Sequence, residues 1–502
     1  MMAKTYRTIV AGGIGLAAMF NIGSAIAQTT PGPLDTWVDN PANGATALQR
    51  SIGHAVQSTC RTLAQQGGFS LPANTPQLDL YLRCNEMVAT ANSFNTSTSS
   101  GRTLGYTQAA QLRAVLQQVS GEELAAQGAL STQVSSGQFA NIAGRLNALR
   151  LAGASVASRG RAASLNEQPR NRELYADNSN LPRLGAGAAS DSGDQRRWGW
   201  FIESSYGFGD HDQTASEDAF DFDSVSLSTG TDYNFGSAVL GFSAGFDNYK
   251  ADFDNATLVS GGDIEVKGIS GSVFGAYFGD AVSINGIATY GSLDSDVTRR
   301  AQYASANSGC SPVCGASRQF KGSPDGSYVA LGVTLSRDFS AGGWDITPSL
   351  TGSYRDVDID AYAEAESLTS GGLALAYDEQ QIESTRAILG VAFSRPVSKA
   401  FGVLTPNFRV EWHHEFEDDA RVLRAKYRLE NDIGLSASNN FSCAISCFAF
   451  TTGPIDSDFG VAGVGLSATF AQRMQAYVYY EALLGVENVS GNSLALGVRG
   501  AF

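Results

Sequence analysis

From residue 196 onward, apolar and polar residues alternate along the chain with a period of two. This alternation is typical of β-strands, because successive side chains of a strand point to opposite faces of the sheet. Between Leu404 and His413, for example, the even positions are apolar and the odd positions are polar. Twelve such strands are predicted, beginning near residues 196, 222, 237, 262, 281, 326, 343, 374, 400, 456, 473 and 490.

The connections between these strands alternate in length. Short turns are expected at 234–237, 279–281, 340–343, 396–400 and 471–474, and the last connection, near 488–492, is also short. Most of the others are long, acidic and rich in Ser, Gly and Asn. Short turns on one side and long loops on the other are typical of an outer-membrane β-barrel, and an even strand number puts both barrel termini on the short-turn side.

A barrel in lipid must close, because the hydrocarbon offers no hydrogen-bond partners to an open strand edge. Its apolar residues then contact lipid, and its polar or small residues line the lumen. A soluble β-sandwich or barrel is the alternative interpretation. The predicted strands run ten or more residues, longer than usual, and the sequence ends on an aromatic residue of the apolar face, so both features favour the membrane barrel.

The first part of the chain has a helical period instead. Helices are predicted over 44–66 and 77–92, and again within 106–152, where Phe139, Ile142, Leu146 and Leu149 form one apolar stripe. Residues 92–103 are polar and low in complexity, which predicts a linker. Residues 153–195 are rich in Gly, Ala, Ser, Asn and Arg without a period, which predicts a second linker.

Charge divides the chain in the same place. The 502 residues carry a net charge of −15, with +5 in residues 1–190 and −20 in the remainder. Phosphate binding needs a basic face, so the acidic barrel half argues against a nucleic-acid partner. The mean hydropathy of −0.11 argues against a helical membrane protein.

The N-terminus has the features of a secretory signal peptide over residues 1–27. Lys4 and Arg7 precede an apolar run of 12 residues, which is too short for a membrane-spanning helix. Ala25 and Ala27 form an A-x-A cleavage site, with Gln28 as the expected first mature residue. A buried N-terminal helix is the alternative, but the charged flank and the cleavage site agree with export.

The six cysteines suit an exported protein, because an even number in an oxidising compartment indicates disulfides. Nearest-neighbour pairing is the expectation, although the spacing leaves other pairings open. Neither C-x3-C segment has a His or carboxylate beside it, which argues against zinc, and no cofactor is expected. The candidates are Cys60 with Cys84, Cys310 with Cys314, and Cys443 with Cys447.

Residues 196–502 resemble the autotransporter β-domain, the translocator of type V secretion in Gram-negative bacteria. The segments that carry the resemblance are RRWGWFIESSYGFGD, GGWDITPSLTGSYRDVDIDAYAE, VLTPNFRVEWHHEFEDDAR and YEALLGVENVSGNSLALGVRGAF. The resemblance implies a mainly β protein with a 12-stranded antiparallel transmembrane barrel and an α-helix threaded through its lumen. It also implies export of an upstream passenger to the cell surface, help from the barrel assembly machinery, and an assembly signal that includes Phe502.

This resemblance divides the mature chain into a short helical passenger (28–103), a helical region (104–152), a linker (153–195) and the barrel (196–502). The upstream segment at 107–150 is also similar to the region before such barrels, and 137–152 is the candidate lumenal helix. Some relatives cleave themselves at paired asparagines in that helix. No Asn-Asn pair occurs in 137–152, so this activity is not expected here.

Three motifs have alternative interpretations. Ser243 lies in a G-x-S-x-G sequence, but the alternation continues through it, so a strand position is expected and not a nucleophile elbow. His413 and His414 precede an acidic run, but neighbouring strand residues point to opposite faces and do not chelate one metal. The acidic run from Asp356 to Glu366 is expected to form solvated outer loops, with weak cation binding as the alternative.

Charged residues at lumen-facing positions are the strongest candidates for a functional set. Buried charges must pair or stay hydrated, so we expect a network that grips the lumenal helix through Arg145 and Arg150. The lumen-facing set is Glu203, Arg355, Arg386, Arg409, Glu411, Glu481 and Arg499.

The sequence therefore favours an outer-membrane protein, in contact with lipid, that displays a short helical passenger. One alternative is a pore or plugged barrel whose helical N-terminus stays in the periplasm or lumen. Another is an enzyme carried in the passenger, but no nucleophile and base set is recognisable there, so we expect no enzyme. What the passenger binds is not encoded in any recognisable motif.

Overall fold

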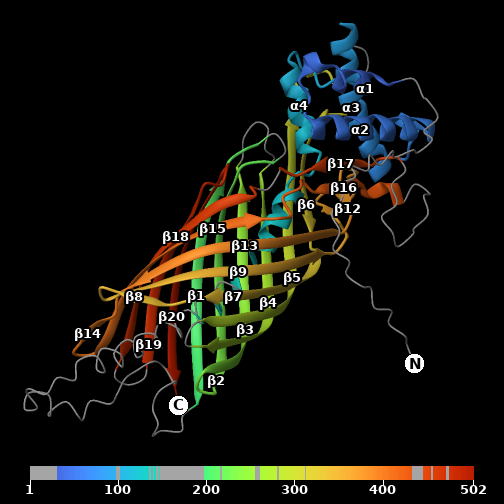
Figure 1. Ribbon diagram of the computed structural model, residues 1–502. Coiled ribbons are helices and arrows are strands. Elements are labelled where there is room, and N and C mark those ends of the chain that lie inside the picture. The colour runs from blue at the N-terminus through green and yellow to red at the C-terminus, as the bar shows by residue number, and fades with distance from the viewer. Residues whose placement is uncertain are drawn as a thin grey trace, which may run out of the picture.

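The computed structural model has a large β-barrel with a helical region at one end (Figure 1). It describes residues 31–97, 102–134, 137, 138, 141, 142, 146, 197–214, 217–254, 261–279, 282–310, 312–431, 445–453, 456–470 and 474–501. Among these residues, no helix is both long and apolar enough to cross a membrane.

The helical region comprises α1–α4, within residues 31–118. Local sequence sets the helix starts: Thr46 and Gln49 form a capping box before α2, and Thr75 caps α3, which has Pro76 in its first turn. The disulfide between Cys60 and Cys84 joins α2 to α3, with 5.5 Å between the Cα atoms. The helices are α1 (Pro33–Val38), η1 (Pro41–Asn43), α2 (Ala47–Gln65), η2 (Gly68–Ser70), α3 (Pro76–Thr96) and α4 (Ala109–Gln118).

A further helical stretch follows α4. Its described residues are 124–134, 137, 138, 141, 142 and 146, and they are called the lumen segment below.

Twelve antiparallel strands form the barrel, as predicted. The sheet closes because β1 pairs with β20, from Gly199 opposite Ala501 to His211 opposite Val489. The strands are β1 (Trp198–His211), β2 (Phe220–Asn234), β3 (Ala238–Phe253), β4 (Gly262–Phe278), β5 (Ser283–Ala304), β7 (Asp325–Ser336), β9 (Trp344–Ile359), β13 (Gln380–Ser394), β15 (Gly402–Glu415), β18 (Asp458–Phe470), β19 (Met474–Leu484) and β20 (Val489–Ala501). Two short strands, β8 (Phe339–Ala341) and β14 (Val397–Lys399), extend the short-turn end.

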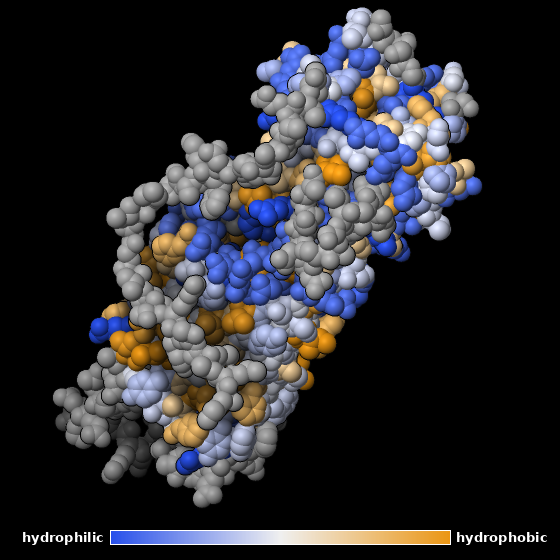
Figure 2. All heavy atoms as spheres, turned by 90° about the vertical axis from the view of Figure 1, so that its right-hand side faces the viewer, coloured by the Kyte–Doolittle hydropathy of each residue, from blue (hydrophilic) through white to orange (hydrophobic). Residues whose placement is uncertain are grey.

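The alternation of the sequence becomes an apolar outer face and a polar inner face. In β3, Phe242 is 54% exposed, whereas Ser243 and Asp247, at inward positions of the same strand, are buried. On the face drawn in Figure 2, apolar residues gather on the barrel, and a hydrophilic band separates them from the helical region. This arrangement suits a lipid-facing surface, because a large exposed apolar belt is unfavourable in water.

The long loops contain strands that the periodicity does not reveal. In the β5–β7 and β9–β13 loops, β6 (Gly315–Gly322) pairs with β11 (Ala365–Glu366). A separate four-stranded sheet contains β10 (Tyr362–Ala363), β12 (Leu375–Tyr377), β16 (Val422–Tyr427) and β17 (Phe448–Thr451), and η4 (Arg428–Asn431) follows β16. The strand predicted from 374 therefore begins at Gln380, because 375–377 belongs to this loop sheet.

Two loop predictions are wrong for the same reason. Asp356 and Asp358 of the predicted acidic loop lie in strand β9, Asp360 is exposed as expected, and Glu364 is only 1% exposed. The predicted linker at 92–103 is also wrong, because α3 continues to Thr96 and Arg102 and Thr103 are buried. In both places the polar side chains are paired inside the contact between the helical region and the loops.

Candidate functional site

Charged side chains from neighbouring strands meet on the inner wall of the barrel. Arg409 on β15 lies 3.3 Å from the Glu411 carboxylate and also pairs with Glu481 on β19. Such partners matter on the inner wall, because a buried charge without a partner is costly. These three members of the predicted charge set therefore come together.

The remaining members lie on the wall with other partners. Arg386 contacts Glu415 at 2.7 Å, and Arg499 lies 3.4 Å from Asp232. Glu415 was considered only as part of the acidic run after His414, and Asp232 was not singled out, although both occupy inward positions of the same alternation. Glu203 and Arg355 are buried, with 2% and 6% of their surface exposed.

The lumen segment contacts this wall through two amide side chains. Gln138 Nε2 donates to the backbone carbonyl of Leu227 at 3.2 Å, and Gln138 Oε1 accepts from Ser228 Oγ at 2.7 Å. Asn141 Nδ2 donates to the same Ser228 Oγ at 2.8 Å. Leu227 and Ser228 belong to β2, so these hydrogen bonds tie the segment to a barrel strand.

Small residues on the wall make room for this segment. A Cβ placed on Gly245 would overlap the side chain of Gln138, and one on Gly268 would lie 2.6 Å from Val134 Cγ1. Glycine at these two positions therefore permits the close approach.

Apolar packing follows the segment along the lumen. Leu130 and Val134 share a buried cluster with inward residues of β3, β4, β5, β7, β9 and β13, and Ile142 and Leu146 share another with Phe201 and Phe274. The predicted lumenal helix at 137–152 overlaps this segment. Arg145 and Arg150, the expected partners of the wall carboxylates, lie outside the described residues.

At the long-loop end, Arg299 of β5 forms a bidentate contact with Glu364. The nitrogen–oxygen distances are 2.8 Å and 2.6 Å, and both side chains are 2% exposed. The same carboxylate accepts from Tyr377 Oη at 3.0 Å and from the Leu375 N–H at 2.9 Å. Four donors around one carboxylate connect the end of a barrel strand to the loop sheet.

A second buried carboxylate, Glu86 of α3, lies between the helical region and the β5–β7 loop. Arg83 and Arg102 approach it at 2.9 Å and 2.8 Å, and the N–H of Gly315 donates to it at 3.0 Å. Burial raises the pKa of Glu86 above its usual value, against the lowering effect of the two arginines.

The Cys310–Cys314 disulfide closes the loop segment beside Glu86, as nearest-neighbour pairing predicted. Glu86 Oε, Cys310 Sγ and Cys314 Sγ lie close enough to share a metal ion. The two sulfurs are bonded to each other, however, and metal binding by cysteine needs free thiolates. Cys447 is also disulfide-bonded, and Cys443 lies outside the described residues.

The motif residues have ordinary structural positions. Ser243 lies inside β3, which continues to Phe253, so the strand–turn–helix geometry of a nucleophile elbow is absent there. His413 lies 3.2 Å from Glu411, and His414 lies 3.0 Å from Asp458, so the two histidines have different partners. The cleavage-site residues Ala25, Ala27 and Gln28 and the terminal Phe502 lie outside the described residues.

Solved structures with a similar fold include three autotransporter units. The translocator domain of NalP from Neisseria meningitidis is 15% identical, with a TM-score of 0.44 over 62% of this chain and 90% of that chain. The β-domain of BrkA from Bordetella is 17% identical, with a TM-score of 0.40 over 61% and 99%. The transport unit of AIDA-I from Escherichia coli is 14% identical, with a TM-score of 0.39 over 62% and 93%.

No curated protein sequence matches this chain. The family model described as "Autotransporter beta-domain" matches residues 200–481, which is more than half of the sequence. This protein therefore belongs to the autotransporter β-domain family.

Proposed function

We propose that the barrel spans the outer membrane and that the helical region, once exported through it, is displayed at the cell surface. The observation that carries this proposal is the position of α1–α4 at the end of the barrel that bears the long loops (Figure 1). In outer-membrane barrels the long loops are extracellular and the short turns periplasmic. Helices packed on the long loops are then outside the cell.

The lumen segment supplies the connection that this route requires. It follows α4 directly and contacts β2 on the inner wall through Gln138 and Asn141. These hydrogen bonds give partners to polar side chains that would otherwise lack them in the lumen. After export, the lumen segment then closes the pore. Folding and insertion of the barrel are assigned to the barrel assembly machinery, with Phe502 as part of the signal that it reads.

A plugged barrel is the second candidate, because the same lumen contacts would also retain a plug. It differs in placing the helical region in the periplasm. The proposal assigns no catalytic step to the chain, and neither Ser243 nor the His413–His414 pair has a geometry that suggests one.

An epitope inserted at the exposed turn between α2 and α3 distinguishes the two candidates. Residues 72–74 are exposed and lie between helices, so an insertion there disturbs little packing. Display predicts antibody binding on intact cells. Binding that requires permeabilisation of the outer membrane would overturn display and support the plug.

A further inference from the structure

The helical region and the long loops of the barrel share one apolar core. Trp37, Ile52 and Met87 come from the helices, while Leu375 and Phe448 come from the loop sheet, and all five are almost fully buried in the same cluster. Two- to six-residue strands such as those of the loop sheet are not stable alone. The apolar faces of both parts would be exposed to water if the parts separated.

Backbone groups pair across the same contact. The N–H of Ala306 donates to the carbonyl of Leu104 at 2.8 Å, much as in a β-ladder. Nearby, Tyr106 Oη donates to the carbonyl of Ala304 at 2.7 Å. These bonds join the end of β5 to the segment between α3 and α4.

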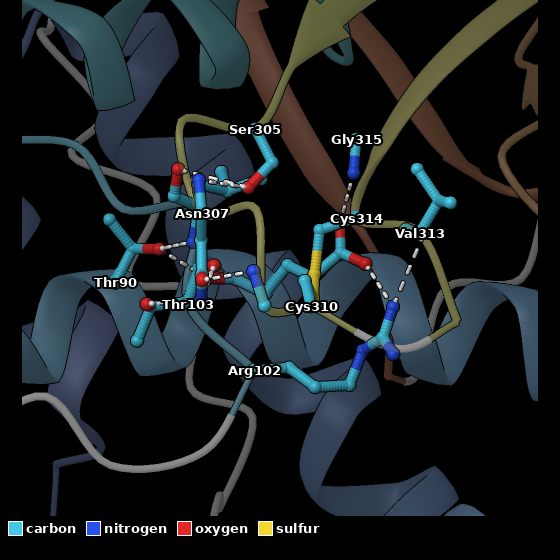
Figure 3. Close-up of a disulfide and its surroundings, with 12 residues drawn as sticks. Thr90, Arg102, Thr103, Ser305, Asn307, Cys310, Val313, Cys314 and Gly315 are labelled. Carbon is cyan, nitrogen blue, oxygen red and sulfur yellow. Dashed lines mark hydrogen bonds and ion pairs between the residues drawn. A yellow bond between two sulfur atoms is a disulfide. The ribbon is translucent and has the colours of Figure 1, made fainter.

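Charged groups of the helices are also satisfied by the loops. Gly315 follows the Cys310–Cys314 disulfide in the β5–β7 loop (Figure 3). Arg83 donates to the carbonyl of Gly315, and the N–H of Gly315 donates to Glu86. On the next turn, Asp79 contacts Arg318 at 3.3 Å and accepts from the N–H of Gly372 at 3.1 Å. Removing the helices would take these partners away from the N–H groups of Gly315 and Gly372.

We propose that the helical region is one half of a composite head whose other half is the barrel's own long loops, so that it stays bound to the barrel instead of being released as free cargo. The head is defined as α1–α4 together with β6, β10, β11, β12, β16 and β17. The occupant of the loop surface is thus the exported segment of the same chain. That the helical region docks after export rests on the proposed function, whereas its docking on the long loops does not.

In this proposal the loops bind the helical region through a close contact at Gly372. Gly372 lies so close to α3 that a Cβ placed on it would overlap the Pro76 carbonyl oxygen and lie 2.7 Å from Leu80 Cβ. The three atoms nearest to such a Cβ all belong to α3. Gly372→Ala is therefore a wedge directed at the contact and not at the loop itself.

The test uses the purified full chain in detergent, with a specific protease site inserted after the exposed residue Ser97. The Cys60–Cys84 and Cys310–Cys314 disulfides each lie within one half of the head, so neither holds the fragment to the barrel. After cleavage, the proposal predicts that the fragment with α1–α3 co-elutes with the barrel in size-exclusion chromatography until denaturant is added. A fragment that elutes alone, beside a barrel that still migrates as folded, would overturn it.

Matched glycine variants locate the contact. We expect Gly372→Ala to speed dissociation of the cleaved fragment by about tenfold or more, a change of the size expected when one close packing contact is lost. Gly309→Ala is the control. The nearest atom to a Cβ placed on Gly309 is Asn307 Oδ1 at 3.4 Å, which belongs to the same β5–β7 loop as Gly309 and not to the helical region. Equal dissociation rates of the cleaved fragment in the two variants would contradict the assigned contact. If Gly372→Ala does not fold, the co-elution test on the chain without glycine substitutions still tests the proposal. Because the assay is done in detergent, it gives the same result whichever side of the membrane the head faces.

Discussion

The N–H of Gly315, in a barrel loop, donates a hydrogen bond of 3.0 Å to the carboxylate of Glu86, in helix α3. The two residues are separated by the whole lumen segment and by five barrel strands in the sequence. Their contact places α3 against the β5–β7 loop, at the long-loop end of the barrel. This bond therefore joins the helical region to a long loop of the barrel.

Replacement of Glu86 by glutamine should destabilise the head. Arg83 and Arg102 would lose their carboxylate while still buried, and breaking a buried ion pair costs about 3 kcal/mol or more. We expect a lower urea concentration at which the head becomes protease-sensitive. Asp39→Asn is the control, because that carboxylate is 56% exposed beside His54 and should contribute about 0.5 kcal/mol or less. Equal effects of the two substitutions would contradict the buried role of Glu86.

The stability of the head should fall as pH rises toward neutrality. Burial, followed by the nearby charge of Asp79, raises the pKa of Glu366 to about 7, although Arg318 opposes this. The folded head then binds more protons than the unfolded chain between the unfolded pKa and about 7. Its stabilising contribution, at most about 3 kcal/mol, is complete below the unfolded pKa and is lost as pH rises through the folded pKa.

This pH dependence can be measured as the urea midpoint of the head at pH 5 and pH 8. The unmodified chain should have the higher midpoint at pH 5, and Glu366→Gln should reduce the difference. A midpoint that rises with pH in the unmodified chain, and equally in Glu366→Gln, would be inconsistent with the raised pKa of this group.

Removing the side-chain amides of the lumen segment should weaken its binding to the inner wall of the barrel. Gln138→Ala and Asn141→Ala each remove a partner of Ser228, at an expected cost of about 1–3 kcal/mol. The temperature at which the folded barrel converts to its slower-migrating unfolded form on a gel should fall. Gln381→Ala, which removes an exposed amide bonded to Asp356, should leave that temperature unchanged.

Charge reversal inside the lumen should also lower the thermal stability of the barrel. Glu481→Lys and Glu411→Lys each place a positive charge beside Arg409, at an expected cost of about 2 kcal/mol. The same gel assay measures the effect, with Glu383→Lys on an exposed position as the control. Exchange of the charges in Arg409→Glu with Glu481→Arg should restore part of the loss, and unchanged stability in the single variants would disprove the pairing.

The barrel was predictable because every strand has lipid on one face and the lumen on the other, which requires apolar and polar residues to alternate. Alternation placed Phe242 outside and Ser243 inside, and the same rule marked Arg409, Glu411 and Glu481 as inward. The helices of the first part of the chain were predictable from their period. The pairing of Cys60 with Cys84 was one expectation among several that the spacing left open, and the structure confirms it.

The head was not predictable because its contacts join segments that are distant in sequence. Glu364 belongs to an acidic run typical of solvated loops, and only its pairing with Arg299 of β5 explains its burial. Arg102 and Thr103 lie in a polar stretch typical of a linker, yet they contact the β5–β7 loop. No periodic pattern encodes such pairs, so the two halves of the head were not recognised as one unit.

Two protease sites in one chain test the threading of the chain through the barrel most directly. One site is inserted after Ser97, in the head, and the other before Trp198, where the barrel begins. On intact cells, added protease should cut the first site and leave the second uncut until the outer membrane is permeabilised. Protection of the site after Ser97 on intact cells, with cleavage only after permeabilisation, would contradict surface display.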